Sequence, residues 1–143
     1  MSGLTILTIP FGSDLGVLAM ALRHDVFVVE QHVPEEVEAD AYDATATHVV
    51  AIEAGMVVGA LRMLYLVEHV KIGRVAVRAD ARGRGIASAM MHHAMQLARS
   101  RGETKFYLTA QIDKLALYEK LGFVAYGDQF QDGGMPHLAM KTY

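Results

Sequence analysis

Apolar residues recur along this chain at helical spacing in two places and in shorter runs elsewhere, and these patterns predict its secondary structure. One series repeats every three or four positions, as the buried face of a helix does: Leu15, Leu18, Ala19, Leu22, Val26 and Val29. A second series has the same spacing: Ile86, Met90, Met91, Ala94, Leu97 and Ala98. We therefore predict helices over about residues 14–30 and 84–101, with a shorter third helix over residues 113–121. Gly102 and Gly122 are predicted to end the second and third helices.

Between these helices, runs rich in β-branched and aromatic residues predict strands. They span residues 4–9, 47–53, 56–67, 72–77, 104–110, 123–126 and 136–142. Ala54-Gly55 predicts a hairpin turn, and Gly59 is expected to mark a bulge in the strand that follows. Strands joined by helices favour parallel pairing, whereas hairpins favour antiparallel pairing. The order therefore predicts an α/β (α+β) fold with a mixed sheet of six to seven strands, flanked by helices.

Composition and charge limit the classes of protein that this pattern can represent. With 143 residues, of which 52% are hydrophobic, the chain predicts a single domain over residues 1–143. The sequence contains no apolar run of about 20 residues and no recognisable signal peptide, so a cytoplasmic protein is expected. The net charge of −3 argues against general nucleic-acid binding. Because there is no cysteine, disulfides, thiolate metal sites and cysteine nucleophiles are excluded.

The stretch from Lys71 to Ala87 departs from this acidic balance. It carries five basic side chains against the single carboxylate of Asp80, and it joins a predicted strand to a predicted helix. Gly83 and Gly85 allow the backbone to approach a ligand closely, and a helix N-terminus presents unpaired N–H groups. These features predict a cradle for a phosphate or pyrophosphate. The alternative is a tight turn between strand and helix with solvated arginines.

Two other phosphate-binding patterns fit this stretch less well. A P-loop requires Gly-x-x-x-x-Gly-Lys-Ser/Thr, which the sequence lacks. A dinucleotide fingerprint would need glycine where Ser88 stands. Glu103 lies at about the right distance for the acid that binds ribose, but it precedes the next strand, whereas that acid belongs at the strand's end.

A second candidate feature is the acidic segment between the first helix and the second strand. It carries six carboxylates and no lysine or arginine: Glu30, Glu35, Glu36, Glu38, Asp40 and Asp43. The segment is either a solvated surface or the wall of a site that attracts a cation.

Three motifs together resemble the GNAT superfamily of acyl-CoA N-acyltransferases. They are the loop Arg82-Gly83-Arg84-Gly85-Ile86-Ala87, the strand Arg74-Val75-Ala76-Val77 and the element Leu117-Tyr118-Glu119-Lys120-Leu121-Gly122-Phe123. The similarity narrows to a small bacterial ElaA-like branch through residues 23–31, the acidic segment, His48 and residues 135–140. It covers nearly the whole chain, and it implies the GNAT fold with a mostly antiparallel sheet.

The resemblance also implies a co-substrate, acetyl-CoA or coenzyme A, and no metal. Backbone amides of the loop would hold the pyrophosphate, and the strand would pair with the pantetheine arm at a separation from the strand over residues 104–110. The implied cofactor-binding residues are Val75, Ala76, Val77, Arg82, Gly83, Arg84, Gly85, Ile86 and Ala87, with Gln111 as a further contact. Tyr118 matches the family position that gives a proton to the leaving thiolate; otherwise it is a packing residue on its helix.

Without cysteine or a Gly-x-Ser-x-Gly elbow, direct attack by an acceptor amine in a ternary complex remains. The general base is open. His24, His32 and His69 have no special context, and His92 and His93, which are adjacent on a helix and face different directions, are expected to be structural or exposed. Through the branch-level resemblance, His48, Arg62, Arg74 and His137 are candidate acceptor-binding residues. Glu38 and Asp40 join them as candidates for a cationic group, whereas an arginine would suit an anionic one.

We therefore predict a cytoplasmic acetyl-CoA-dependent N-acetyltransferase that acts on a primary amine, either small or on a peptide. The alternative is a non-catalytic acyl-CoA-binding or regulatory module, which would not need the proton donor Tyr118. Nucleic-acid and membrane partners are not expected, and a homodimer is compatible with the resemblance.

Overall fold

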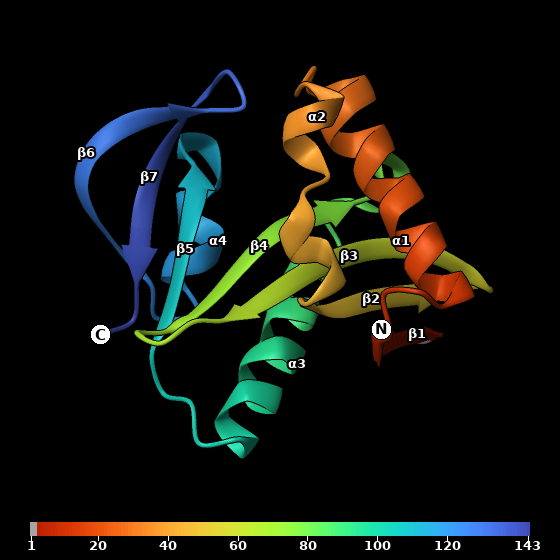
Figure 1. Cartoon of the computed structure of the whole chain (residues 1–143), viewed down its shortest axis with the longest axis horizontal. Helices are drawn as coiled ribbons and strands as arrows, with labels where there is room; N and C mark the ends of the chain where they lie inside the picture. Colours follow the sequence, from red (N-terminus) through yellow and green to blue (C-terminus); the bar gives the residue numbers. More distant parts are fainter. Residues whose placement is uncertain (1–2) are drawn as a thin grey trace.

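The computed structural model describes residues 3–143, and its seven strands form one sheet (Figure 1). The strands are β1 (Leu4–Ile9), β2 (Thr47–Glu53), β3 (Met56–Tyr65), β4 (Val70–Val77), β5 (Phe106–Gln111), β6 (Val124–Asp132) and β7 (Met135–Lys141). The helices are α1 (Asp14–Arg23), α2 (Glu35–Glu38), α3 (Ile86–Ser100) and α4 (Leu115–Glu119). The spatial order is β1-β2-β3-β4-β5-β7-β6, and β4–β5 is the parallel pair among antiparallel ones. The predicted fold class, a mixed and mostly antiparallel sheet flanked by helices, is confirmed.

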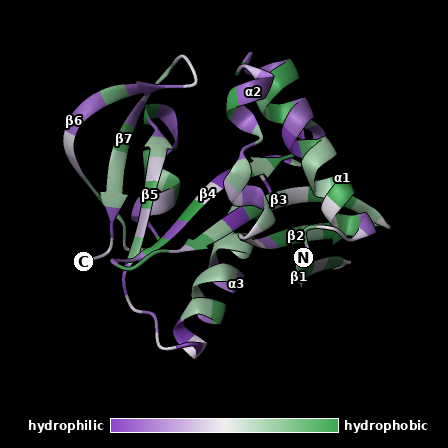
Figure 2. Ribbon diagram, in the orientation of Figure 1, coloured by the Kyte–Doolittle hydropathy of each residue, from purple (hydrophilic) through white to green (hydrophobic). Residues whose placement is uncertain are grey.

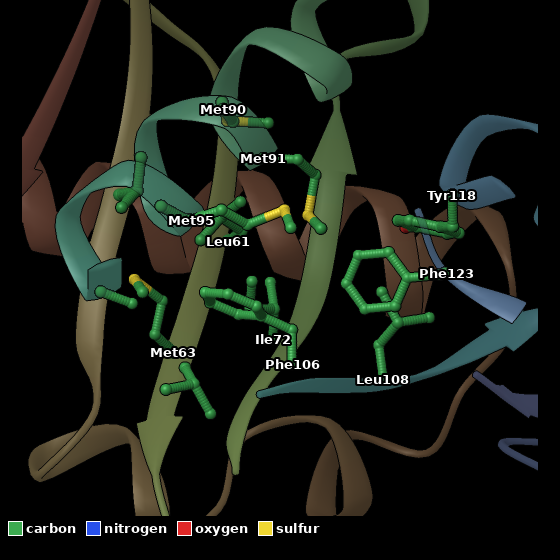
Figure 3. Packing of buried hydrophobic residues seen from close by; sticks show 14 of the residues in the cluster. Leu61, Met63, Ile72, Met90, Met91, Met95, Phe106, Leu108, Tyr118 and Phe123 are labelled. Carbon is green, nitrogen blue, oxygen red and sulfur yellow. The ribbon is translucent and has the colours of Figure 1, made fainter. Parts of the chain in front are cut away.

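Two apolar layers cover opposite faces of this sheet. On one face, Ala19, Leu22 and Val26 pack against Val50 and Ala76 of the central strands. On the other face, the methionines of α3 pack with residues of β3, β4 and β5, as Figure 3 shows. Alternate residues of each central strand therefore enter different layers, as the period of a strand requires. By contrast, α2 is mostly hydrophilic (Figure 2). Within residues 3–143, no helix is long and apolar enough to cross a membrane.

Gly59 allows α3 to approach the sheet closely. A Cβ atom at this position would lie 2.9 Å from Met90 Cε and 3.1 Å from Ile86 Cγ2. The register between β2 and β3 shifts beside this glycine, where Ala51 pairs with Gly59 but Ile52 pairs with Val57. Ile86 is the first residue of α3, so the absence of a side chain at Gly59 also lets the N-terminus of this helix lie close to the sheet.

Some predicted bounds differ from the structure where polar residues hide the pattern. The first helix has the predicted bounds, residues 14–30, but its second part, His24–Glu30, is π-helical. The third is shorter, because a 3-10 turn (Ile112–Lys114) precedes α4. The strand predicted over residues 123–126 extends to Asp132 as β6, which lies at the edge of the sheet and is largely exposed.

The strands β4 and β5 separate after a short contact. They pair only through Val70 with Phe106 and Lys71 with Tyr107, and they then diverge (Figure 1). A bulge in β4 accompanies the divergence, because Arg62 pairs with Gly73 whereas Ala60 pairs with Ala76. The separation leaves strand edges of β4 and β5 without a partner strand in the middle of the sheet.

Candidate active site

A cavity of about 420 Å³ lies at the separation between β4 and β5. It brings together most of the predicted site residues: Glu38, Arg62, Arg74, Val75, Ala76, Val77, Arg82, Gly83, Gly85, Ile86, Ala87, Gln111, Tyr118 and His137. Three predicted residues are not in its lining: Asp40, His48 and Arg84. The cavity therefore joins the predicted cradle to the acidic segment through the opening in the sheet.

The loop before α3 has the backbone geometry of an anion cradle. Gly83 and Gly85 have φ angles of +76° and +81°, in the left-handed region that favours glycine. Gly85 is the N-cap of α3, and no side chain caps the helix there. A Cβ atom at either glycine would meet nothing within 4 Å, so the space above both residues is open. The first N–H groups of α3 lack partners within the helix, and this end of α3 could hold a phosphate group.

The basic side chains of this loop are already paired with carboxylates. Arg82 donates to both carboxylate oxygens of Glu30, at 2.6 and 2.7 Å, and these bonds lower the pKa of Glu30. Arg84 pairs with Glu53 in the same two-pronged way. Arg78 donates to Asp80 at 2.6 Å. Three arginines of this stretch, Arg78, Arg82 and Arg84, are therefore matched by carboxylates, and the backbone N–H groups of the loop remain as donors for an anion.

Tyr118 lies on α4, on the other side of the cavity from the acidic segment. Its ring meets Phe123 edge-on with 6.2 Å between the ring centroids, and 8% of the residue is exposed (Figure 3). Burial raises the pKa of the phenol to about 12, so the hydroxyl is protonated at neutral pH. No described residue hydrogen-bonds this hydroxyl, and Tyr118 lines the cavity. Tyr118 can therefore act as a proton donor.

The acidic segment is held by three arginines in a buried network. Arg23, which is 1% exposed, donates to Glu38 Oε1 and to Asp43 Oδ1, in each case at 2.6 Å. Arg62 donates to Asp40 Oδ1 at 2.6 Å and to Asp43 Oδ1 at 3.0 Å. Arg74 donates to the carbonyl oxygens of Glu38 and Val37 at the end of α2. These bonds fix the short helix α2 against β3 and β4.

The protonation of this network follows from its pairing. Burial alone would raise the pKa of Asp43, but hydrogen bonds from Arg23, the Asp40 backbone and Arg62 lower it to about 2. A hydrogen bond from Arg62 likewise lowers the pKa of Asp40. Burial and the nearby charges of Arg62 and Arg23 lower the pKa of Arg74. Three carboxylates and three guanidinium groups thus form a network of zero net charge.

Arg74 occupies a strained position within β4. Its φ angle is +53°, which is uncommon for a residue with a side chain. This conformation lies at the bulge where β4 leaves the regular register with β3. In this conformation the Arg74 guanidinium donates hydrogen bonds to the carbonyl oxygens of Glu38 and Val37.

The two candidate histidines differ in position. His48 Nε2 donates to the carbonyl oxygen of Asp43 at 2.8 Å, so the ring supports the acidic network from outside the cavity. His137 Nδ1 donates to the carbonyl oxygen of Met135 at 2.8 Å, and this residue lines the cavity. Gln111 Nε2 donates to Gln31 Oε1 at 3.0 Å and links β5 to the segment after α1.

Sequence reasoning did not single out three residues that shape the site: Arg23, Glu30 and Asp43. Glu30 and Asp43 were visible only as members of the acidic segment. Their partners, Arg82, Arg23 and Arg62, are 19 to 52 positions away along the chain. A charge pair at such distances leaves no periodic signal, although a lone arginine in an apolar helix, such as Arg23, is a hint of buried pairing.

Comparison with known proteins identifies the class to which this fold and cavity belong. Residues 12–143 match the family described as "Acetyltransferase (GNAT) domain". The chain therefore belongs to the GNAT family, and the predicted superfamily is confirmed. Among residues 3–143, no cluster of His, Asp or Glu is placed to hold a metal ion.

Relatives of the chain agree with this membership. An uncharacterized N-acetyltransferase, YjcF, from Bacillus subtilis is 32% identical over 123 residues, covering 85% of this chain and 88% of the relative. The crystal structure of an acyl-CoA N-acyltransferase from Pseudomonas aeruginosa is similar with a TM-score of 0.85 and 33% identity, covering 98% of this chain and 99% of that one. Escherichia coli ElaA is similar with a TM-score of 0.84 and 26% identity, covering 98% of both chains. The predicted likeness to the ElaA-like branch is confirmed.

Proposed function

We propose that this protein is an acetyl-CoA-dependent N-acetyltransferase that transfers an acetyl group to a primary amine within a ternary complex. The observation that carries the proposal is that one cavity is lined by the cradle at α3, the open edge of β4 and Tyr118. Membership of the GNAT family supports an acyl-CoA N-acyltransferase.

Coenzyme A has chemical groups that suit each part of this cavity. Its pyrophosphate would accept hydrogen bonds from the backbone between Arg82 and Ala87, at the N-terminus of α3. Its pantetheine arm carries two amides and would pair with the free backbone groups of residues 75–77, as an added strand does. Gln111, at the end of β5, lines the opposite wall of the opening. The thioester would then lie where β4 and β5 separate.

The residues present can support direct transfer. The amine nitrogen attacks the thioester carbon, and a backbone N–H among residues 75–77 stabilises the developing oxyanion. The carbon–sulfur bond then breaks, and Tyr118 gives its proton to the departing sulfur. A pKa of about 12 makes Tyr118 a weak acid, so its contribution is expected to be about 100-fold, at the lower end of general-acid contributions.

The acceptor is proposed to enter from the side of α2 and the β6–β7 turn. Glu38 lines this side, and its Oε1 is bound by Arg23 while Oε2 has no hydrogen bond to a described residue. That oxygen could bind a cationic amine, which agrees with the cation-attracting wall predicted from the acidic segment. Arg62 and Arg74 also line this side and could contact an anionic part of the acceptor. Asp40 and His48 would act indirectly, by holding the arginines and the loop in place.

The experiment that tests this function is a panel of primary amines incubated with acetyl-CoA, with the release of free thiol measured. We expect amine-dependent thiol release and an acetylated product detectable by mass spectrometry. Binding of coenzyme A without thiol release for any amine or peptide would instead favour the non-catalytic acyl-CoA-binding module. No binding and no release would contradict both functions.

A further inference from the structure

We propose that His137 is the general base that removes the proton from the acceptor amine. This inference rests on the proposed acetyl transfer and deepens it. An amine with an ordinary pKa arrives as an ammonium ion at neutral pH, and a nitrogen without a lone pair cannot attack a thioester. Direct transfer therefore needs a proton acceptor on the side of the cavity from which the amine enters.

Hydrogen bonding fixes which nitrogen of His137 is available. Nδ1 lies 2.8 Å from the carbonyl oxygen of Met135, which can only accept, so Nδ1 must carry the proton. In the neutral ring, Nε2 then keeps its lone pair and is the basic atom. No described residue hydrogen-bonds Nε2, this nitrogen is not among the buried unpaired side-chain atoms, and His137 lines the cavity.

Packing holds this imidazole in one orientation. His137 is 8% exposed, and its ring stacks on Phe130 with 6.0 Å between the centroids. It stands directly opposite Gln111 in the pairing of β5 with β7, and opposite Phe130 in the pairing of β7 with β6. A base held by a carbonyl, an aromatic ring and two neighbouring strands needs little reorganisation before it accepts a proton.

The register of the sheet places His137 on the acceptor side. Residues opposite each other in neighbouring strands share a face, so His137 lies on the same face as Gln111, whose amide reaches Gln31 after the first helix. Tyr118 belongs to the core on the other face, together with Leu108 and Met140. The cavity therefore receives a base from one face of the sheet and an acid from the other, through the separation of β4 and β5.

Other groups in the site are less suited to this role. Glu38 is 4% exposed, and its Oε1 is already bound by Arg23 at 2.6 Å, so this carboxylate is held as part of the buried network. His48 lies outside the cavity, and its Nε2 is bound to a carbonyl oxygen. The remaining titratable or charged groups in the lining are Arg62, Lys71, Arg74, Arg82, Lys114, Tyr118 and Asp132.

The protons of the reaction balance with these two residues. The ammonium ion gives one proton to His137 Nε2, and the neutral amine forms the new carbon–nitrogen bond. As the carbon–sulfur bond breaks, Tyr118 protonates the sulfur, and the nitrogen then loses its second proton, which restores the tyrosine. His137 finally releases its proton to solvent, so that one proton leaves for each ammonium ion acetylated.

The test compares His137→Gln with wild type, using His92→Gln as the matched control. His92 is exposed on α3 and does not line the cavity. For an amine that is protonated at the assay pH, we expect kcat/KM of His137→Gln to fall about 100-fold, at the lower end of general-base contributions. The KM for acetyl-CoA and the melting temperature should change little, and His92→Gln should match wild type.

Two further measurements separate proton removal from a structural role. A fluorinated analogue of the acceptor, already neutral at the assay pH, should be acetylated by His137→Gln almost as fast as by wild type. Added imidazole should restore part of the activity of His137→Ala with the protonated amine.

The outcomes distinguish this inference from the proposed function. Equal loss of activity with the protonated and neutral acceptors, or wild-type kcat/KM in His137→Gln, would overturn the role of His137 alone. If wild type acetylates no amine or peptide at all, the proposed function fails and the base assignment fails with it.

Discussion

The substitution Asp43→Asn tests the buried network that holds α2 and the acidic segment beside the cavity. The Asp43 side chain is 3% exposed and accepts hydrogen bonds from Arg23 at 2.6 Å and from Arg62 at 3.0 Å. Its pKa of about 2, against an ordinary value of 3.8, corresponds to about 2 kcal/mol of folding stability at neutral pH. Removing one partner of a buried ion pair also leaves the other charges uncompensated, so the total loss should be about 3 kcal/mol.

The sign of the pH dependence follows from the lowered pKa of Asp43. A carboxylate with a lower pKa in the folded state stabilises the fold above its unfolded pKa, and this contribution is lost as the pH falls from about 4 to about 2. The difference in stability between wild type and Asp43→Asn should therefore be largest at neutral pH and should shrink toward pH 2. Urea unfolding followed by circular dichroism at several pH values measures this difference.

Asp40→Asn is the matched control for this experiment. Asp40 bonds the same Arg62 at 2.6 Å, but its side chain is 30% exposed. Solvent screens an exposed pair, so we expect a loss of about 1 kcal/mol or less. Equal stability of Asp43→Asn and wild type at neutral pH would refute the proposed network energetics. A large difference that does not change with pH would show that the loss does not come from ionisation of Asp43.

Two other substitutions test the cavity. Tyr118→Phe keeps the ring against Phe123 but removes the proton, so kcat should fall about 100-fold while acetyl-CoA affinity and melting temperature change little; wild-type kcat across the pH range, with chemistry rate-limiting, would make Tyr118 only a packing residue. Gly59→Ala places a Cβ 2.9 Å from Met90 Cε, which is overpacking that should cost about 1 kcal/mol and lower the melting temperature by about 4 °C. An unchanged melting temperature would show that α3 can move away from β3 without loss.

Much of the fold could be predicted because its signals are local. Helical spacing from Leu15 to Val29 and from Ile86 to Ala98 identified the long helices, and each observed strand was predicted at least in part. The hairpin turn at Ala54-Gly55 was also predicted, and in the structure both residues adopt positive φ angles. The bounds of the first helix, residues 14–30, were predicted, although its change to a π-helix after Arg23 was not. Bounds failed where exposed polar residues interrupt an edge strand, as in β6.

The candidate site was only partly predictable. The loop and the Tyr118 element are contiguous motifs, and the structure places both at one cavity. The ion pairs were not predictable, because Arg82 meets Glu30 and Arg84 meets Glu53 only after the sheet has formed. The acidic segment therefore appeared more exposed than it is: Glu38 and Asp43 are buried against Arg23. The free Nε2 of His137 depends on a backbone carbonyl, which no sequence pattern reports.

The measurement that tests the central claim most directly is calorimetric titration of acetyl-CoA into wild type and into Gly85→Glu. Gly85 has a φ angle of +81° and open space where a side chain would lie, so glutamate would strain the loop and bring a negative charge into the cradle. We predict saturable binding of one acetyl-CoA per chain to wild type, with about 2.7 kcal/mol of stabilisation at one hundred times Kd. Gly85→Glu should remain folded and lose this binding. No binding to wild type at millimolar acetyl-CoA, or equal binding to Gly85→Glu, would contradict the assignment of this cavity.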